Sequence, residues 1–406
     1  MTGHSDKQPN PINRKLRSFG VELAGAAKSN IRQYTMIAAL LLIWITFTFL
    51  TNGIFLTPRN LSTLFLQMVT IAILTGGMLL IMLTGNIDLS VGAVCGTLGA
   101  AAAFMMRRMD VPPGLAILLT IALGAVVGLW NGYWVAYQGV PAFIVTLSSQ
   151  IAFRGITLAI TNGKTIGGFP ESFKDIGKSY IPRLFQDAPF HDLSALIGVA
   201  AIGIFLWMEF RKRRRRLDNG LTVLPWSLEI PKIILVCATI ALVGIVFASY
   251  NGIPYAMVIL AVVVAVYSVL TKHAPFGRHV YAIGGNKEAA RLSGVNIRKT
   301  MLIIFLSMGM LAGVAALVFT ARLDAATADA GNLFELNAIT ACIIGGTSTS
   351  GGIGTVFGAL IGALVMASLD NGMSLMDLPI MIQYIVKGVI LLLAVWVDIA
   401  NKRKTA

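Results

Sequence analysis

The chain has 406 residues, of which 56% are hydrophobic and 12% are charged, and its mean hydropathy is +0.78. A soluble protein carries about twice that share of charged residues, so the composition excludes a water-soluble fold and indicates a polytopic integral membrane protein. The net charge is +14, but the lysines and arginines lie mostly in short loops and at the termini. This placement is typical of a topology signal, and we exclude nucleic acid as a partner.

The first 33 residues are polar and carry several basic side chains without a short apolar core behind them. They predict a cytoplasmic N-terminal tail (1–33) rather than a secretory signal peptide. Residues 34–398 are expected to form one transmembrane domain, because apolar runs of about 20 residues follow one another through it. These runs are Tyr34–Thr51, Leu61–Leu83, Ile87–Met106, Leu115–Tyr137, Pro141–Ile160, Leu193–Met208, Ile233–Tyr250, Pro254–Leu270, Met301–Ala321 and Ile380–Val397.

Two polar loops divide the middle of the chain. The long loop 161–192 is predicted on the outer face, where it is the largest surface for meeting a partner; the alternative is a solvated cap without a partner. The basic run Arg211–Arg216 opens a second loop, 211–230, directly after an apolar run. We interpret it as a cytoplasmic stop-transfer anchor that touches anionic lipid, rather than as a nucleic-acid signal.

The loop 272–300 is the longest strongly polar interruption in the second half of the chain. In it, Gly284-Gly285 is expected to break any preceding structure, Asn286 to cap a helix of roughly two turns, and Gly294 to follow its end. A helix this short is unstable in water alone, so it requires a partner or a membrane surface against which to dock. The segment comprises Gly284, Gly285, Asn286, Lys287, Glu288, Ala289, Ala290, Arg291, Leu292, Ser293 and Gly294.

The apolar region Glu335–Leu369 is divided by the glycine-rich stretch GGTSTSGGIG. It predicts either two passes or a re-entrant pair, and hence an all-α protein with ten to twelve transmembrane helices. Irregular backbone here must be buried in protein or line a wet cavity. Residues 399–406 are basic and are expected to form a cytoplasmic C-terminal tail.

Positive charge predicts the orientation of the spans. Counted from an inside N-terminus, the tail, the run Arg211–Arg216, the loop 272–300 and Lys402-Arg403-Lys404 all fall inside. Arg107-Arg108 falls outside and is the one exception to the rule. Both termini are therefore expected in the cytoplasm.

A weak sequence similarity between the two halves of the chain suggests a possible internal repeat. Four residues near the start of one apolar run match four in another at constant offset, and Asn131-Gly132 recurs as Asn371-Gly372. Transporters are often duplicated in this way, although four matches among common membrane residues can arise by chance. The matched residues are Gly92, Val94, Gly96 and Leu98 with Gly354, Val356, Gly358 and Leu360.

No enzyme active site is indicated by the sequence. Gly163-Lys164-Thr165 and Gly177-Lys178-Ser179 resemble the end of a phosphate loop, but neither has the required leading glycine. The histidines are scattered, and Cys95, Cys237 and Cys342 lie in apolar runs without metal-ligand spacing. We expect neither a metal nor a cofactor in this chain.

Polar residues within or at the ends of apolar runs are candidates for a translocation path, because a charge in a bilayer is costly and usually faces a pathway or a partner. The alternative is that each caps a helix or bonds backbone amides. The candidates are Asn86, Asp88, Ser90, Asn131, Asn337, Ser350, Asp370 and Asn371.

Several of these stretches resemble a known family. Glu288-Ala289-Ala290 followed three residues later by Gly294 is similar to the EAA-type loop of ABC importer permeases, and YAIGGNKEAARLSGVNI resembles their monosaccharide branch. The resemblance runs from about residue 34 to the C-terminus. It also includes IDLSVG (Ile87–Gly92), PAFIVTL (Pro141–Leu147), Arg154-Gly155, ACIIGGTSTSGG (Ala341–Gly352) and QYIVKG (Gln383–Gly388).

Two details resemble the D-xylose members of that branch: DNGMSLMD at Asp370–Asp377, and an extra apolar pair at about 193–250 that ribose-type permeases lack. One departure is Thr349-Ser350, where many relatives have a Leu or Ala before Ser or Gly. The added hydroxyl leaves the packing of that turn open.

The resemblance implies a permease subunit without enzyme activity, a homodimer in the bacterial inner membrane. It implies that a cytoplasmic subunit binds ATP-Mg and docks on the 284–294 helix, that a periplasmic or extracellular binding protein delivers the sugar, and that transport proceeds by alternating access. D-xylose is the expected substrate; ribose, arabinose or galactose remain alternatives. The alternative interpretation is an ion-coupled secondary sugar transporter that uses the same acidic residues as ion ligands.

Overall fold

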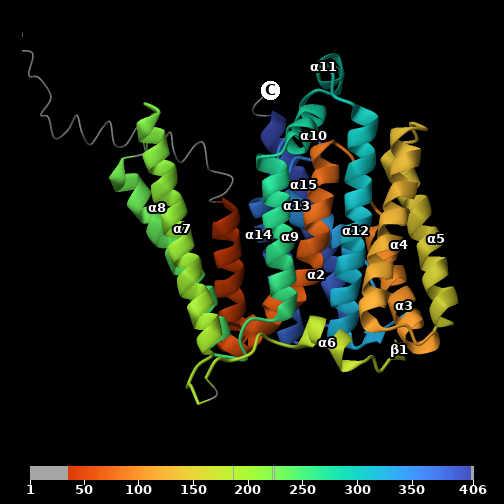
Figure 1. The fold of residues 1–406 in the computed structure, drawn as a ribbon, viewed down its shortest axis with the longest axis horizontal. Helices are drawn as coiled ribbons and strands as arrows, with labels where there is room; N and C mark the ends of the chain where they lie inside the picture. Colours follow the sequence, from red (N-terminus) through yellow and green to blue (C-terminus); the bar gives the residue numbers. More distant parts are fainter. Residues whose placement is uncertain (1–34, 186, 222, 224, 404–406) are drawn as a thin grey trace, which may run out of the picture.

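The computed structural model describes residues 35–185, 187–221, 223 and 225–403. Within them the protein is almost entirely helical, which confirms the predicted fold class, and nine helices are long and apolar enough to cross a membrane. Most of the spanning helices stand side by side in one bundle (Figure 1). The N-terminal tail predicted for residues 1–33 lies outside the described part of the chain.

The elements of the first half are the helix Thr35–Leu50, η1 Ile54–Leu56, α2 Pro58–Leu83, α3 Val91–Arg108, α4 Pro113–Ala136, α5 Ala142–Thr161, β1 Ile166–Gly167 and α6 Glu171–Lys178. Those that follow are α7 Asp192–Asp218, α8 Trp226–Ala248, α9 Tyr255–Lys272, α10 Pro275–Gly285, α11 Lys287–Leu292, α12 Ile297–Leu323, β2 Ala325–Ala326, α13 Phe334–Ile344, α14 Val356–Leu375 and α15 Ile380–Arg403. β1 and β2 pair antiparallel, with Ile166 opposite Ala326.

The core is built around α2 and α12. α2 is buried along nearly its whole length, as expected of a helix that is apolar on all sides. α12 crosses α4 closely, because a Cβ at Gly128 would overlap the carbonyl oxygen of Phe305 and a Cβ at Gly309 would overlap that of Gly124. These glycines form the small-xxx-small pattern that lets two membrane helices approach backbone to backbone.

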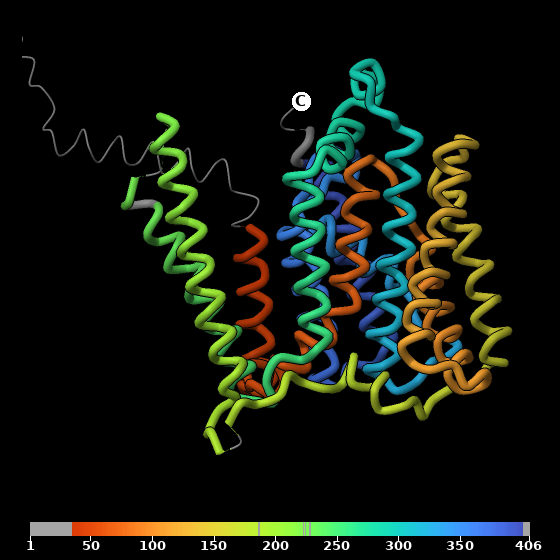
Figure 2. Tube along the Cα trace, in the orientation of Figure 1, coloured from red at the N-terminus to blue at the C-terminus, as the bar shows by residue number. Residues whose placement is uncertain are grey.

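α7 and α8 form a hairpin that stands apart from the other helices over most of its length (Figure 2). Its charged end is joined by the ion pairs Arg213–Glu229 and Lys232–Glu209. The prediction that the run Arg211–Arg216 belongs to a loop is wrong, since α7 continues to Asp218. Basic residues in the last turns of a helix are favoured by its dipole, which explains the extension.

The region 335–369 makes two passes rather than a re-entrant pair. α13 has 11 residues and is about 16 Å long, too short to cross a bilayer. The irregular segment 324–333 covers the remaining depth, and Ala330 within it is buried against Gly96 of α3. The turn 345–355 reaches the end of α2, where the Gly352 amide donates to the Leu83 carbonyl. Much of the irregular backbone is therefore packed against neighbouring helices, as irregular backbone in a membrane requires.

The basic end of α7, the α10–α11 segment and the end of α15 all lie at one end of the bundle, uppermost in Figure 1. We call this the basic end. Arg107 and Arg108 close α3 near the opposite end, beside β1. α15 continues to Arg403, so residues 399–403 of the predicted tail are helical, and the basic residues there are favoured by the helix dipole.

The fold does not support the internal repeat that the weak sequence similarity suggested. Gly92 to Leu98 lie at the start of α3 and match the start of α14. Asn131 lies in α4, however, while Asn371 lies in α14 itself. A repeat that pairs α3 with α14 would require Asn371 in α15, so the two matches cannot belong to one duplication.

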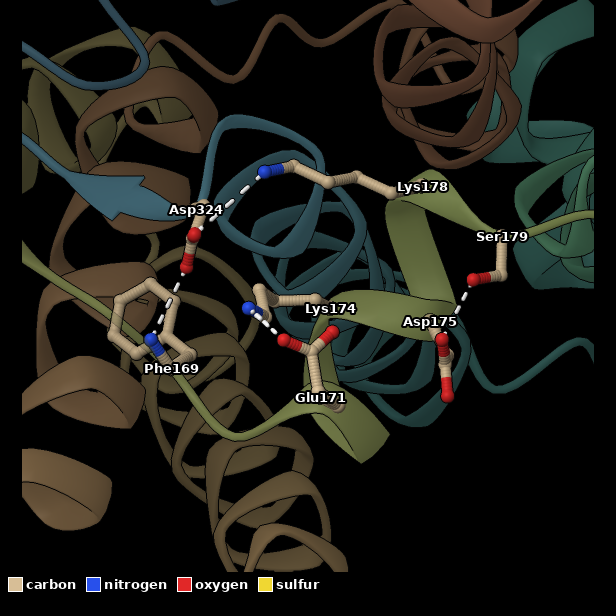
Figure 3. Close-up of polar contacts among 7 residues, drawn as sticks. All are labelled: Phe169, Glu171, Lys174, Asp175, Lys178, Ser179 and Asp324. Carbon is tan, nitrogen blue, oxygen red and sulfur yellow. Dashed lines mark hydrogen bonds and ion pairs between the residues drawn. The ribbon is translucent and has the colours of Figure 1, made fainter.

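The loop 161–192 is a packed strap rather than a free solvated cap. Phe169 and Phe173 are buried in an apolar cluster with α3 and α12, and a Cβ at Gly177 would overlap the backbone of Arg322. Figure 3 shows its polar fastening: the Phe169 amide donates to the Asp324 carboxylate (3.1 Å), and Lys178 lies 3.6 Å from the same carboxylate. The loop is thus fixed to the end of α12.

The attachment of the loop 161–192 to the Asp324 carboxylate is expected to depend on pH. The amide of Phe169, followed by Lys178 and Lys174, holds the pKa of Asp324 below its usual range. A lowered pKa stabilises the folded strap above the ordinary value, about 3.9, and that contribution is lost as pH falls below it. In an Ala326→Cys variant whose native cysteines are replaced, dithiodipyridine labelling should be faster at pH 3.5 than at pH 5.5, by up to about threefold. With Asp324→Asn added, labelling should already be fast at pH 5.5; equal rates in all cases would contradict the fastening.

Candidate functional site

The short helix predicted after Asn286 is present at the basic end. The Asn286 side chain accepts a hydrogen bond from the Ala289 amide (2.9 Å), which caps α11 at Lys287. The helix ends at Leu292, and Gly294 takes a φ of +84°, a left-handed conformation that suits glycine. The Val295 amide then bonds back to the Ala290 carbonyl. Local capping chemistry therefore confirms the predicted helix and both its ends.

Every residue of α11 is exposed except Ala290. Ala290 is buried against the bundle, whereas Leu292 is 82% exposed. Glu288 and Arg291 form an exposed ion pair (2.7 Å) beside it. Figure 1 shows α11 as the outermost element of the basic end. An exposed leucine framed by an ion pair, outside the membrane-spanning layer, is suited to insertion into a groove of a protein partner.

The helix that precedes α11 ends at Gly285, so the break falls where Gly284-Gly285 predicted it, with both glycines still inside the helix. Both residues are the last turn of α10, which runs from Pro275 to Gly285. The glycine at 284 serves close packing, because a Cβ there would overlap the carbonyl oxygen of Leu83 at the end of α2. A Cβ at Gly285 would meet nothing within 4 Å.

Three of the candidate path residues are brought together inside the bundle. Asn131 donates to the Ser90 hydroxyl (3.1 Å), and that hydroxyl donates to Asp88 (2.6 Å). Ser149, which the sequence analysis did not single out, donates to Asn131 (2.6 Å). Asp88, Ser90 and Asn131 also line a cavity with room for about one water molecule. These residues form a buried polar layer between α3, α4 and α5.

In a second part of this layer, sequence reasoning missed Gln150 and Arg154 as candidates for the path. Gln150 of α5 donates to Glu335 at the start of α13 (2.9 Å), and Arg154 one turn later donates to the Ala330 carbonyl (2.8 Å). Glu335 Oε2 and Arg154 Nη2 are buried without a hydrogen-bond partner. The available signal was the pair Gln150 and Arg154, spaced four apart on the same helix.

The other five candidates lie elsewhere. Asn86 bonds to Thr84 (3.0 Å) in the turn after α2, Ser350 lies in the turn 345–355 near Gly85, and Asn337 is buried in α13. Asp370 pairs with Lys387 of α15 at 2.8 Å, and Asn371 exchanges hydrogen bonds with Asn60 of α2 (2.8 and 3.1 Å). The eight candidates therefore do not share one site.

The Asp370–Lys387 pair is expected to be structural. Removing one charge leaves the other in the apolar layer, which costs more than the pair contributes. Asp370→Asn or Lys387→Met alone should lower the yield of monodisperse protein in mild detergent by about fivefold or more. The double variant should recover at least half of the wild-type yield. A double variant as poor as either single one would show that the two residues act separately.

A helical bundle with an interrupted span, a buried polar layer and a short capped helix outside it defines the class of membrane transport permeases. The chain belongs to the permease family described as "Branched-chain amino acid transport system / permease component", whose model matches residues 60–395. Its role is therefore transport rather than catalysis.

Individual relatives are similar over nearly the whole chain. The xylose transport system permease protein XylH of Haemophilus influenzae is 44% identical, over 92% of this chain and 98% of its own. XylH of Escherichia coli K12 is 43% identical, over 99% and 100%. The ribose import permease protein RbsC of the same strain is 35% identical, over 92% and 95%. The resemblance to monosaccharide permeases is thereby confirmed. No solved structure matches the chain.

Proposed function

We propose that this chain is the transmembrane subunit of an ATP-driven importer of D-xylose. The supporting observation is full-length similarity to xylose permeases at 43–44% identity, against 35% for the ribose permease. The family description names branched-chain amino acids, but the relatives that match from end to end carry sugars in their names. A pentose is therefore the substrate best supported.

In this proposal the driving force comes from a separate cytoplasmic subunit. That subunit binds ATP-Mg, and α11 docks on it through Leu292 and the Glu288–Arg291 pair. The chain itself holds no cofactor. The basic residues at the end of α7 contact anionic lipid headgroups of the bacterial inner membrane, with both termini on the cytoplasmic side.

Alternating access fits the interrupted span. The polar layer holds the start of α13 through Gln150 and Arg154, yet leaves Glu335 Oε2 and Arg154 Nη2 unpaired. Unpaired buried groups are costly, so these two groups favour a second arrangement of α13 in which they find partners. A partner that binds one arrangement better shifts the population toward it. Two copies of the permease, a binding protein on the outer face and two ATP-binding domains complete the transporter.

Substrate class is tested by competition. Cells that lack xylose uptake and express this chain with its cognate ATP-binding and sugar-binding subunits should accumulate labelled D-xylose. A hundredfold excess of unlabelled D-xylose should abolish accumulation, and the same excess of ribose or leucine should reduce it by less than half. Full competition by ribose would indicate that the substrate is another pentose. Competition by leucine would contradict the proposal that the chain transports a sugar.

Orientation is tested by labelling. In variants whose native cysteines are replaced, Glu288→Cys of α11 should react with a membrane-impermeant maleimide in inside-out vesicles and not in spheroplasts. Asp175→Cys of α6 should show the reverse, since α6 lies near the opposite end of the bundle (Figure 1). Reaction of Glu288→Cys in spheroplasts would place α11 outside the cell and contradict its docking on an ATP-binding subunit.

A further inference from the structure

The end of α10 packs backbone to backbone on two other parts of the bundle. A Cβ at Gly284 would overlap the carbonyl oxygen of Leu83 and lie 2.5 Å from the amide nitrogen of Gly352. The Gly352 amide donates to that same Leu83 carbonyl at 2.9 Å. We call Gly284, Leu83 and Gly352 the glycine joint. It joins α10, the end of α2 and the turn between α13 and α14.

A side-chain contact reinforces the glycine joint. The Tyr281 hydroxyl, one turn before Gly284 in α10, donates to the Gly354 carbonyl at 2.7 Å. Gly351, Gly352 and Gly354 have φ values of +90°, +75° and +159°, so this close-fitting turn depends on glycine. The turn is closed by the Ser348 amide, which donates to the Ile353 carbonyl at 2.8 Å. α10 therefore contacts a backbone loop of defined shape.

The same turn is tied to α15 on its other side. Thr349 donates to Asp398 through its hydroxyl (2.9 Å) and its amide (3.2 Å). This contact accounts for the hydroxyl at Thr349 whose packing the sequence left open. Through Gly345 the turn continues into α13, which carries Glu335 to the polar layer. A displacement of the turn must therefore move the interrupted helix.

We infer that the glycine joint transmits the displacement of α11 to α13 and α14, and that Gly284 and Tyr281 are positioning residues for this step; the inference rests on the proposed function. α11 follows α10 directly through Asn286, so the two helices move together at their junction. The contact at Gly284 is between main-chain atoms, so no side-chain rotamer can absorb the motion. Packed backbone contacts of this kind pass small shifts on rather than damping them.

The test separates coupling from docking. The permease is reconstituted with its cognate ATP-binding and sugar-binding subunits, and both sugar uptake per ATP hydrolysed and capture of the ATP-binding subunit are measured. Gly284→Ala should retain capture within twofold and lower uptake per ATP at least tenfold. Gly285→Ala, whose Cβ meets nothing, should keep at least five times the coupling of Gly284→Ala. Retained coupling in Gly284→Ala, or a loss of capture in parallel, would overturn the inference.

A second pair of variants, with smaller changes, tests the inference even if Gly284→Ala does not fold. Tyr281→Phe removes one hydrogen bond and should lower uptake per ATP by about two- to tenfold. Tyr133→Phe on α4 removes a bond of the same length, from Gln138 (2.7 Å), away from the glycine joint, and should leave coupling unchanged. Equal coupling in the two variants would overturn the inference. Absence of ATP-dependent uptake in the unmodified protein would instead contradict the proposed function itself.

Discussion

Gly128→Ile is expected to abolish the folded protein. The Cβ at this position would overlap the Phe305 carbonyl, and Gly309 faces Gly124 one turn away in the same crossing. α4 and α12 can approach only because both lack side chains there, and separating them opens the centre of the bundle. The amount of monodisperse protein recovered by gel filtration in mild detergent should fall at least tenfold.

Gly203→Ile in α7 is the matched control. It makes the same change in a spanning helix, but a Cβ at Gly203 meets nothing within 4 Å and the position is exposed on the α7–α8 hairpin. Its yield should stay within twofold of the unmodified protein. A normal yield of Gly128→Ile would show that the α4–α12 crossing does not hold the bundle together.

Leu292→Asp is expected to remove binding of the ATP-binding subunit. Leu292 is the exposed apolar side chain of α11, and a central apolar anchor in an interface contributes about 2 kcal/mol or more, some 30-fold in affinity. A carboxylate in an apolar groove adds a desolvation cost. Capture of the ATP-binding subunit by the purified permease should therefore fall at least 30-fold, and ATP-dependent uptake should fall with it.

Two variants limit the interpretation of that loss. Leu292→Met keeps an apolar side chain of similar volume and should bind within threefold of the unmodified protein. Leu221→Asp makes the identical change at another exposed leucine of the basic end, in the turn after α7, and should not alter capture. Undiminished capture by Leu292→Asp would remove α11 from the interface.

The parts of the fold that depend on local chemistry were predictable from the sequence. Apolar runs of spanning length identified the helical bundle, and the cap at Asn286 with the left-handed Gly294 gave both ends of α11. Positive charge placed three basic segments at one end, which the bundle bears out. These features require only neighbouring residues, so one chain is enough to infer them.

The parts that depend on contacts between distant segments were not predictable. The role of Gly284 in close packing could not be predicted, because the Leu83 carbonyl on which it packs lies some two hundred positions earlier. Hydropathy left two passes and a re-entrant pair open for the region of α13, because an irregular segment provides part of the crossing, with Arg154 bonded to the Ala330 carbonyl. The sequence made Asp370 a candidate for the path, because it does not show that Lys387 lies beside it as an ion-pair partner. In each case the partner, rather than the residue itself, decides the role.

The most direct measurement of the account is D-xylose uptake by proteoliposomes that contain the permease with and without its ATP-binding subunit. Uptake should require that subunit together with ATP and the sugar-binding protein, and it should persist when an uncoupler abolishes the proton gradient. Uptake that continues without the ATP-binding subunit, or that an uncoupler stops, would identify an ion-coupled transporter and contradict the account.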